Sequence, residues 1–476
     1  LETKDPGLKK KGSGSIVGDG EIIGVAVAVE GWSGYYSFGH EQDNFFSKEA
    51  VIKWLKDICA LPCPKIFHNA MYDVCWIHAY GVHINGIIVD TMIMAAILNE
   101  NRMYYSLNSL SYLELGEVKS EKALQDAADK KGVDAKSEMY KLPASMVGGY
   151  AEKDAELTLK LFKKFSSQIR QQGLKKIFDL EVNLFRCLID MRFQGVRVDI
   201  DKAERLKHVL ETREKSLLSE VKRITGVDVQ IWAPRSIAKV FDYLGLDYKR
   251  TEKTNAPSFT KDILSTHENE VVKRIAEARE LNKTHTTFID TIIRYEHKGR
   301  IHADINQLRS DAGGTITGRF SYSNPNLQQI PSRDDLLGPA VRGLFIPEEG
   351  CDWGCFDYSQ QEPRLVVHYA ALYKLPSVYD VVDAYETDSN SDFHQTVADM
   401  ADIPRSQAKT INLGLFYGMG KNKLQAELGV TKDKAAELFN TYHAKVPFVK
   451  QLMEKASNRA QDRGQIRTLL GRLCRF

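Results

Sequence analysis

The first third of the chain alternates short apolar runs with amphipathic stretches. Residues 22–29, 65–67 and 87–89 are strand-like runs of mainly apolar residues, and each contains Ile. Between them, apolar residues recur at spacings of three and four, which is typical of helices that bury one face. Strands that alternate with helices in this way predict an α/β domain over residues 1–172.

Helical periodicity dominates the next part of the chain, up to about residue 298. A long charged helix is expected over residues 202–223, and a loop rich in Thr, Asn and Pro interrupts the helical pattern over residues 251–259. After residue 300 short strand-like runs return, residues 376–447 are helical again, and the last residues turn back toward the strand region. At 476 residues the chain suits two to four domains.

A carboxylate ends one of the later apolar runs. The run includes Cys355 and Phe356, so we expect a strand that ends at Asp357. A helix that carries Glu362 and Arg364 should follow it. The sequence leaves two roles open for Arg364, which could contact DNA or pair with a local carboxylate.

A second helix is expected to begin after Asp402 and Pro404, which are good start signals. Four side chains recur at every fourth position and so form one slowly drifting stripe on it: Arg405, Lys409, Leu413 and Tyr417. The first half of the stripe is cationic and the second half is apolar and aromatic, which suits a triphosphate joined to a sugar and a base. Phe416 lies off the stripe and is expected in the core.

Taken singly, these residues have ordinary structural explanations. An Asp at a strand end usually caps a turn, and Arg and Lys four residues apart usually form a solvated helix face. In this order they also meet a chemical requirement. Phosphoryl transfer needs metal-bound carboxylate on one side and fixed cations on the other, because negative charge accumulates on the transferring oxygens. The two motifs together predict a nucleotidyl transferase.

The front domain carries acidic motifs of its own. Asn69-x2-Tyr72-Asp73 lies where a short strand is expected to give way to a helix. Tyr150 and Asp154 open the last helix of the same domain and lie one turn apart on one face. Taken alone, Asp154 could be a partner of the helix dipole in a first turn.

These motifs resemble those of family A DNA polymerases, the family of bacterial DNA polymerase I and the replicative enzymes of T-odd-like phages. Further segments carry the resemblance in the family's order: Arg279-x3-Lys283-x3-Thr287, Thr317-Gly318-Arg319-Phe320-Ser321, Pro325-Asn326-Leu327-Gln328-Gln329-Ile330-Pro331 and Asp392-Phe393-His394. The resemblance implies an α/β, ribonuclease H-like 3′–5′ exonuclease domain followed by a right-hand polymerase core. Its expected divisions are exonuclease 1–172, helical thumb 173–300, mixed α+β palm 301–375, helical fingers 376–447 and a return to the palm 448–476.

The resemblance implies a role for each polymerase residue. Asp357 would bind two Mg²⁺ ions, with the backbone carbonyl of Tyr358 as a further ligand, and Lys409 would also be catalytic. Glu362 would stand beneath the sugar and exclude a 2′-hydroxyl. The implied nucleotide-binding residues are Gln360, Glu362, His394, Arg405, Lys409, Leu413 and Tyr417. The implied DNA-binding residues are Lys283, Arg319, Asn326 and Arg364.

The resemblance also implies a two-metal exonuclease site in the front domain. The family uses four carboxylates to hold two divalent ions, which lie about 3.5–4 Å apart in such sites. The ligands present here would be Glu2, Asp73 and Asp154, with Tyr150 as the catalytic residue that orients the attacking water. The family's first Asp would stand just before Leu1.

Two features depart from the family pattern. The family's second catalytic carboxylate lies in a His-Asp-Glu motif downstream of Gly471-Arg472, whereas this sequence ends at Phe476. We therefore interpret the sequence as a fragment, open at both ends, that binds DNA without extending it. Leu413 is the second departure, because the family commonly has Phe or Tyr there.

The interpretation implies that the protein binds primer–template DNA and deoxynucleoside triphosphates and acts as a monomer. Its expected location is the cytoplasm of a bacterium or of a phage-infected host. The sequence does not identify a processivity factor. Two alternatives stay open. A single-subunit RNA polymerase shares the Asp and Arg/Lys/Tyr elements, although the exonuclease motifs and Glu362 argue against it. A DNA-binding protein with a non-functional site is disfavoured by the near-complete set of site side chains.

Charge and cysteine content refine this picture. The net charge is only +2, but residues 404–426 hold four basic residues and no acidic one, and residues 448–476 hold seven basic against two acidic. Such clusters of positive charge favour binding to the phosphate backbone of a nucleic acid.

The seven scattered cysteines predict reduced thiols in the cytosol. The segment Cys59-x3-Cys63-x4-His68 lacks a fourth ligand for zinc. No signal peptide or long apolar run supports membrane association.

The stripe position of Leu413 yields a kinetic prediction for the protein expressed from its complete coding sequence. Leu413→Phe should speed nucleotide incorporation by roughly two- to tenfold, because an aromatic ring offers about 0.5–1.5 kcal/mol beyond its area. Leu413→Tyr should also relax discrimination against dideoxynucleotides, since its hydroxyl can take the place of the absent 3′-OH. Single-nucleotide insertion kinetics measure both effects. Equal rates for Leu, Phe and Tyr would mean that this residue does not touch the substrate.

Overall fold

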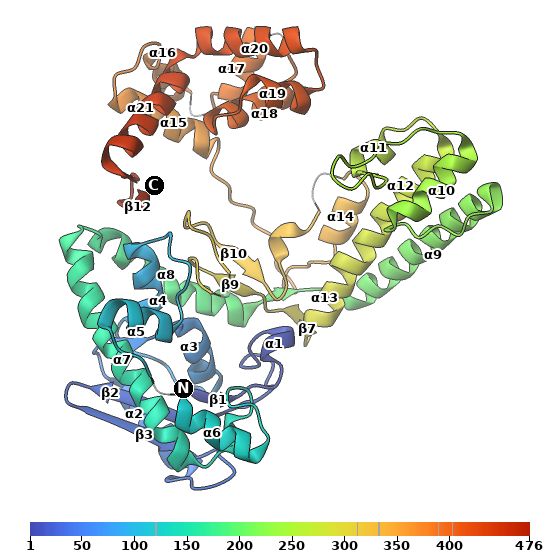
Figure 1. The fold of residues 1–476 in the computed structure, drawn as a ribbon. Helices are drawn as coiled ribbons and strands as arrows, with labels where there is room; N and C mark the ends of the chain where they lie inside the picture. The colour runs from blue at the N-terminus through green and yellow to red at the C-terminus, as the bar shows by residue number, and fades with distance from the viewer. Residues whose placement is uncertain (120, 312, 332–333, 389, 402) are drawn as a thin grey trace. The chain divides into compact units, whose positions relative to one another are not determined.

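The computed structural model describes residues 1–119, 121–311, 313–331, 334–388, 390–401 and 403–476, without the side chains of Lys9, Met400 and Ala401. The chain divides into two compact units, Leu1–Asp352 and Trp353–Phe476 (Figure 1). Asp402, one of the two expected helix start signals, lies outside the described residues.

Two small sheets lie in the front part of the first unit. Strands β1 (Glu2–Lys4), β2 (Glu21–Val29) and β3 (Trp32–Ser37) form an antiparallel sheet in the order β1-β2-β3. Strands β4 (Lys65–Phe67) and β5 (Ile88–Asp90) pair in parallel. The three strands expected from the apolar runs are confirmed, with bounds that shift by at most one residue.

Helix α7 (Ala144–Gln171) packs against β2 and β3. Its buried side chains Leu157, Leu161 and Phe165 recur every four residues, so one face of the helix enters the core. The other helices of this part are α1 (Leu8–Lys11), α2 (Lys48–Ala60), α3 (Ala70–Ala79), α4 (Thr91–Leu98), α5 (Leu107–Leu115), α6 (Lys122–Lys131), the short 3₁₀ helix η1 (Met139–Lys141) and α8 (Lys175–Gln194).

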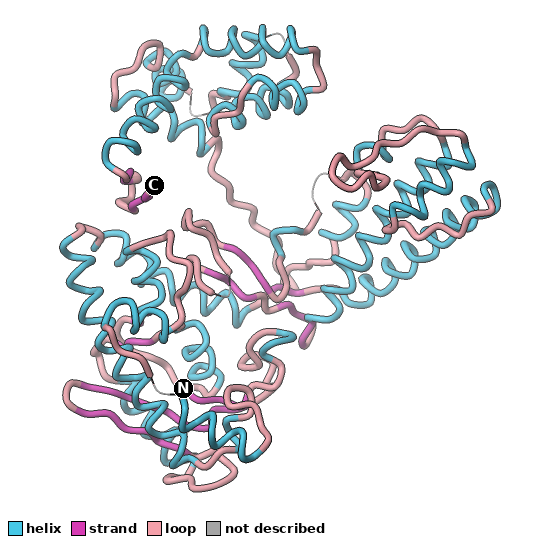
Figure 2. The backbone as a smooth tube through the Cα atoms, in the orientation of Figure 1, coloured by secondary structure: helices cyan, strands magenta, loops and turns pink. Residues whose placement is uncertain are grey.

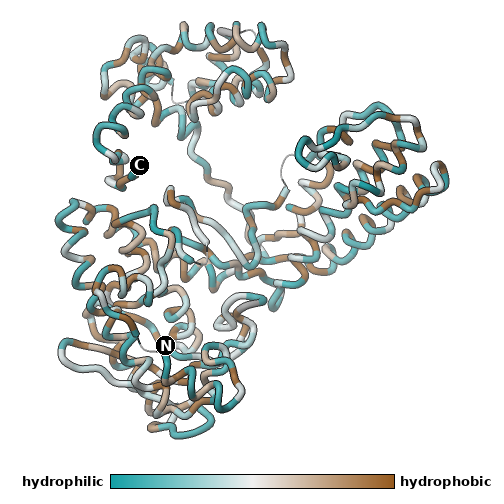
Figure 3. The backbone as a smooth tube through the Cα atoms, in the orientation of Figure 1, coloured by the Kyte–Doolittle hydropathy of each residue, from teal (hydrophilic) through white to brown (hydrophobic). Residues whose placement is uncertain are grey.

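The expected charged helix is α9 (Ile200–Thr225), which packs along α12 (Glu270–Lys283). The Asp199 side chain caps its start by accepting a hydrogen bond from the Lys202 amide at 2.8 Å. Hydrophobic positions recur along α9 between hydrophilic ones (Figure 3), and its buried residues include Ala203, Leu210 and Leu217, spaced by two turns.

The remaining helices of the first unit surround this pair or follow it. They are α10 (Pro234–Leu244), α11 (Lys261–Ser265), the π-helical segment η2 (Thr284–Ile289), α13 (Asp290–Tyr295), the 3₁₀ helix η3 (Leu327–Gln329) and α14 (Leu337–Arg342). Residues 251–259 contain no helix, as expected from their Thr, Asn and Pro content. Short strands form two further sheets, β6-β8-β7 and β10-β9: β6 (Val196–Arg197), β7 (Glu296–His297), β8 (Arg300–Ile301), β9 (Asp304–Asn306) and β10 (Ser321–Ser323).

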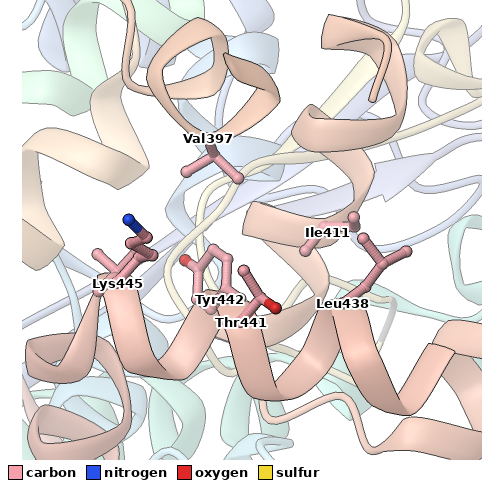
Figure 4. A pocket seen from close by; sticks show the side chains of 7 residues that line it. Val397, Ile411, Leu438, Thr441, Tyr442 and Lys445 are labelled. Carbon is pink, nitrogen blue, oxygen red and sulfur yellow. The ribbon is translucent and has the colours of Figure 1, made fainter. Parts of the chain in front are cut away.

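The second unit is almost entirely helical (Figure 2). Its helices are α15 (Gln361–Leu372), α16 (Tyr379–Thr387), α17 (Phe393–Ala401), α18 (Arg405–Phe416), α19 (Lys421–Leu428), α20 (Lys432–Lys445) and α21 (Pro447–Arg463). A hairpin of β11 (Gln465–Arg467) and β12 (Leu473–Arg475) follows. Side chains of α17, α18 and α20, including Val397, Ile411 and Leu438, close around a gap of only about 10 Å³ (Figure 4), so these three helices share one packed core.

The prediction of a strand that ends at Asp357 is wrong. Residues 351–358 have no regular secondary structure, and Phe356 is 98% exposed. A strand persists only when a second strand satisfies its N–H and C=O groups, and among the described residues none pairs with this segment. The short strands between residue 300 and the expected strand are β8, β9 and β10, all in the first unit.

The seven cysteines differ in their exposure. All seven cysteines are free thiols, and Cys59 is buried. Within the described ranges, no three His, Cys, Asp or Glu side chains are grouped so that they could hold one metal ion, Cys59, Cys63 and His68 included. No helix in the described part of the chain has the length and apolar character needed to cross a bilayer.

The core around α10 gives a stability prediction. Phe241 is completely buried and its ring contacts those of Phe259 and Tyr248, so Phe241→Ala should destabilise these helices by about 3–5 kcal/mol. Native-state hydrogen exchange of α9 and α12 amides measures this loss. Tyr243→Ala is the control on the same helix, because Tyr243 is 61% exposed and should cost less than about 0.5 kcal/mol. Equal losses would contradict the packing described.

Candidate functional site

Three acidic residues from separate elements approach one another in the front part of the first unit. Glu2 lies on β1, Asp73 on α3 and Asp154 on α7. The chain's amino group at Leu1 donates to Asp73 Oδ1 at 2.9 Å, and the charges of both Asp73 and Asp154 act on Glu2. The structure thus brings together the three residues expected to bind metal, although they do not converge on a single point.

Burial and mutual repulsion perturb these carboxyls. Burial raises the pKa of Glu2 from its usual 4.5 to about 7, the Leu1 ammonium opposes this, and the carboxylates of Asp154 and Asp73 add to it. Burial likewise raises the pKa of Asp73 and of Asp154. Negative charge is therefore costly in this cluster unless a cation neutralises it.

The strand-to-helix junction before α3 sets the position of Asp73. The Asp90 carboxylate accepts hydrogen bonds from the backbone N–H groups of Asn69, at 3.0 Å, and Ala70, at 2.8 Å. Asn69 adopts a left-handed conformation with φ of 67°, so the chain turns sharply into the helix. Tyr72 contacts the Thr3 hydroxyl at 2.6 Å and ties the same helix to β1. Asp90 is a buried capping residue that sequence reasoning missed.

Tyr150 and Asp154 share one face of α7, as their spacing predicts. Because α7 begins at Ala144, Asp154 lies in the third turn, which excludes the alternative that it serves as a first-turn partner of the helix dipole. The expectation that Tyr150 opens this helix is wrong by two turns. Helix α7 begins earlier than expected, directly after Leu142 and Pro143, because its first turn is stabilised by the burial of Ala144 and Val147.

A lysine that the sequence did not single out joins these two side chains. Lys119 Nζ donates to Tyr150 Oη at 2.7 Å and to Asp154 Oδ2 at 2.8 Å, and it lies 4.1 Å from the centroid of the Tyr150 ring. Only 8% of the Lys119 side chain is exposed. No spacing or composition signal marks Lys119 in the sequence, because its partners come from a helix that begins 25 residues later.

In the second unit, the start of α15 approaches the end of α18. The Tyr417 hydroxyl donates to Glu362 Oε1 at 2.8 Å. Gln360, in a left-handed conformation with φ of 53°, accepts from the Phe393 amide at 2.8 Å and donates to the Ser391 carbonyl at 2.7 Å. These contacts hold the Glu362 turn against the start of α17, and the sequence did not indicate this role of Gln360.

The cations of α18 lie near His394. Arg405 Nε donates to Asp392 Oδ2 at 2.5 Å, which lowers the pKa of that carboxyl against the effect of burial. His394 is only 4% exposed, and its Nδ1 lies 2.9 Å from Asn412 Nδ2. Burial lowers the pKa of His394, and the nearby charges of Arg405 and Lys409 lower it further. The charge of Asp392 acts in the opposite direction, and the net lowering of the pKa favours the neutral ring.

The other expected residues of the second unit are placed differently. Asp357 and Tyr358 are exposed in the irregular segment before α15, and α18 ends at Phe416, so Tyr417 follows the helix rather than lying on it. Phe416 packs against the core cluster of this unit, as expected. Arg364 Nε donates to the Ser359 carbonyl at 3.0 Å, and its guanidinium lies 4.3 Å from the centroid of the Tyr385 ring.

The expected DNA-binding residues of the first unit lie on three elements. Lys283 is exposed at the end of α12, and Arg319 is exposed in the loop before β10. The Asn326 side chain caps η3 by accepting from the Gln328 amide at 3.1 Å. Arg279, from the same motif as Lys283, instead donates to the carbonyl of Phe259 at 2.8 Å and so packs inside the helical segment.

Comparison with protein families assigns both parts of the chain. A family model described as DNA polymerase family A matches residues 200–476, more than half of the chain. The chain belongs to DNA polymerase family A. A second family model, described as 3′-5′ exonuclease, matches residues 38–170. The predicted family, and the order of an exonuclease domain before the polymerase domain, are confirmed. Domains of both kinds generally use divalent metal ions.

Individual relatives agree with this assignment. The DNA-directed DNA polymerase of Pseudomonas phage M6 is 33% identical over all of this chain and 80% of its own length. DNA polymerase DpoZ of Acinetobacter phage SH-Ab 15497 is 31% identical over 95% of this chain and 79% of its own. The solved polymerase domain of Pol1 from M. smegmatis, in complex with DNA primer-template and dNTP, covers 96% of this chain and 75% of that chain with a TM-score of 0.74. At 21% identity, this likeness shows the fold.

The perturbed carboxyl at Glu2 predicts a pH-dependent stability. A carboxyl with a higher pKa in the folded protein favours folding at low pH, and that contribution is lost as the pH rises from about 4.5 to about 7. In chelator, Glu2→Gln should therefore gain stability relative to the unsubstituted protein across this window. Urea unfolding at pH 5 and pH 8 measures the difference. The exposed Glu41→Gln is the control, and a Glu2→Gln effect that is the same at both pH values would contradict the account.

Proposed function

We propose that this family A polymerase copies a DNA template by two-metal nucleotidyl transfer and proofreads with its own 3′–5′ exonuclease site. The observation that carries the proposal is the succession of an exonuclease match at residues 38–170 and a polymerase match at residues 200–476 in one chain. The relatives from phages M6 and SH-Ab 15497 are both named as DNA polymerases, which favours this function over that of an RNA polymerase.

The deoxynucleoside triphosphate would lie along α18. Arg405 and Lys409 would supply the fixed positive charge that a triphosphate needs, and Leu413 lies further along the same stripe. Arg405 is paired with Asp392, so triphosphate oxygens would replace this carboxylate as its partner. His394 in its neutral form would contribute a hydrogen bond from its remaining ring nitrogen.

Discrimination against ribonucleotides would rest on Glu362. The Tyr417 hydroxyl donates to this carboxylate at 2.8 Å, which limits the positions that the Glu362 side chain can adopt. A fixed carboxylate beneath the sugar would collide with a 2′-hydroxyl and leave a 2′-deoxyribose unhindered. Gln360 supports the pair by bonding the backbone at Ser391 and Phe393.

Primer–template DNA would be held largely through its backbone. Lys283 and Arg319 present exposed cations, Asn326 offers a polar side chain, and Arg364 stands at the start of α15. Contacts of this kind position the duplex without selecting a sequence, which is what a template-copying enzyme needs. We also propose that the protein acts as a monomer in the cytoplasm of a bacterial host; a processivity factor is not assigned.

One buried carboxylate oxygen supports a divalent metal in the front domain, although Glu2, Asp73 and Asp154 are not grouped in the described structure so that all three could hold one ion. Asp154 Oδ1 is buried and has no hydrogen-bond partner among the described residues, and burial, with a smaller contribution from the neighbouring carboxylates, raises the pKa of Glu2. Glu2, Asp73 and Asp154 would hold two divalent ions there, and Asp357 with the Tyr358 carbonyl would hold two Mg²⁺ ions in the polymerase site. When bound, such ions activate the attacking oxygen and stabilise the leaving one. Tyr150 would hold the attacking water by a hydrogen bond.

The proofreading assignment predicts that Asp73→Ala and Asp154→Ala each lower hydrolysis of single-stranded 3′ ends by more than about 100-fold, since even an outer partner of a metal ligand contributes 10–100-fold. Primer extension should be unchanged. Both activities are measured on the protein expressed from its complete coding sequence. The exposed Asp126→Ala is the matched control. Full nuclease activity in a folded Asp73 or Asp154 variant would show that the metal ligands are wrongly assigned.

A further inference from the structure

Lys119 occupies an unusual position for a lysine. It lies in the segment between α5 and α6, yet its ammonium reaches the face of α7 and is almost fully enclosed there. Burying a charged ammonium is costly unless oxygen atoms surround it. Here the nearest are Tyr150 Oη at 2.7 Å and Asp154 Oδ2 at 2.8 Å, with Glu121 Oε1 more distant at 3.7 Å. The burial is thus compensated by the two α7 side chains that the exonuclease reaction would use.

The bond to Asp154 separates the two oxygens of that carboxylate. Oδ2 accepts from Lys119, whereas Oδ1 is buried without a hydrogen-bond partner in the described part of the chain. A carboxylate held by one oxygen cannot rotate freely, so its other oxygen keeps a fixed direction. Outer partners that fix a ligand in this manner are a general feature of metal sites.

The bond to Tyr150 orients the phenol in the same way. An ammonium has donors and no acceptor, so the phenol oxygen must accept from Lys119. The hydroxyl hydrogen of Tyr150 then points away from Lys119, and the Asp154 carboxylate is one acceptor within its reach, which a water or phosphate oxygen would replace in the reaction. The ammonium also lies 4.1 Å from the centroid of the Tyr150 ring, which restrains the ring itself.

We propose that Lys119 is a positioning residue of the exonuclease site. By bridging Tyr150 and Asp154 it directs Asp154 Oδ1 toward the metal and the Tyr150 hydroxyl toward the attacking water. The inference rests on the proposed roles of Tyr150 and Asp154 and adds a residue that acts through both. In the alternative hypothesis, the Lys119 ammonium would only neutralise the charge of Asp154 until a divalent ion replaced it.

The test compares Lys119→Met, which keeps the length of the side chain without its charge, with Lys119→Arg, which keeps the charge. At saturating Mg²⁺, Lys119→Met should lower kcat for a single-stranded oligothymidylate by about 10–100-fold with KM within twofold of the unsubstituted protein. Lys119→Arg should recover part of kcat. Oligothymidylate affinity, measured by anisotropy in Ca²⁺, should stay within twofold. Lys122→Met, at the exposed start of α6, is the control and should leave all values unchanged.

A double variant tests whether Lys119 acts through Tyr150. Residues that act as one unit are strongly non-additive, so Lys119→Met should lower kcat much less in a Tyr150→Phe background than in the unsubstituted protein. Multiplied losses, a Lys119→Met kcat within twofold of normal, or a loss of oligothymidylate binding would each overturn the inference. The Asp154→Ala variant distinguishes a failure of the proposed exonuclease site from a failure of the role of Lys119. If Asp154→Ala retains nuclease activity, the proposed metal ligands are wrong. If Asp154→Ala is inactive while Lys119→Met is fully active, only the role of Lys119 is excluded.

Discussion

Repulsion among buried carboxylates is the constraint on which the front part of the molecule depends. Glu2, Asp73 and Asp154 come from a strand and two helices, and the fold forces their charges together in a poorly hydrated place. Such an arrangement destabilises the protein unless cations are present. The Lys119 ammonium supplies part of the compensation, and divalent ions would supply the rest.

The second unit carries cations instead, which its proposed role with a polyanionic nucleotide would require. Helix α18 carries Arg405 and Lys409 one turn apart, and two neighbouring acidic side chains have partners. Asp392 pairs with Arg405, and Glu362 accepts from Tyr417. The Gln360 side chain, at the start of α15, hydrogen-bonds to the backbone of Ser391 and Phe393 and so connects α15 to the start of α17. Under the proposed function, the two sites would use complementary electrostatics for related phosphoryl chemistry.

Sequence periodicity predicted the elements whose pattern is local. The strand over residues 22–29 and the helix over 202–223 were found within a few residues of their bounds, because burial of one face leaves a regular trace. The motif Asn69-x2-Tyr72-Asp73 was placed at a strand-to-helix junction for the same reason. The strand expected at Asp357 failed because a strand depends on a partner elsewhere in the chain, which a local pattern does not reveal.

The candidate sites show the same division. Spacing on one helix predicted that Tyr150 and Asp154 share a face, and resemblance to a family supplied their roles. Lys119 was missed, because its two bonds join segments that no period connects. The burial of His394 against Asn412 was also beyond the sequence, since it depends on how α17 packs on α18. Side-chain environments of this kind arise from tertiary packing alone.

The central claim is that the front carboxylates form a divalent-cation site of their own. Mn²⁺ binding to the protein in the absence of DNA, followed by electron paramagnetic resonance, tests this most directly. The account predicts that a combined Asp73→Asn and Asp154→Asn variant loses tightly bound Mn²⁺ ions that an Asp357→Asn variant retains. Unchanged Mn²⁺ binding in the combined variant would contradict the account, because it would place the metal away from Glu2, Asp73 and Asp154.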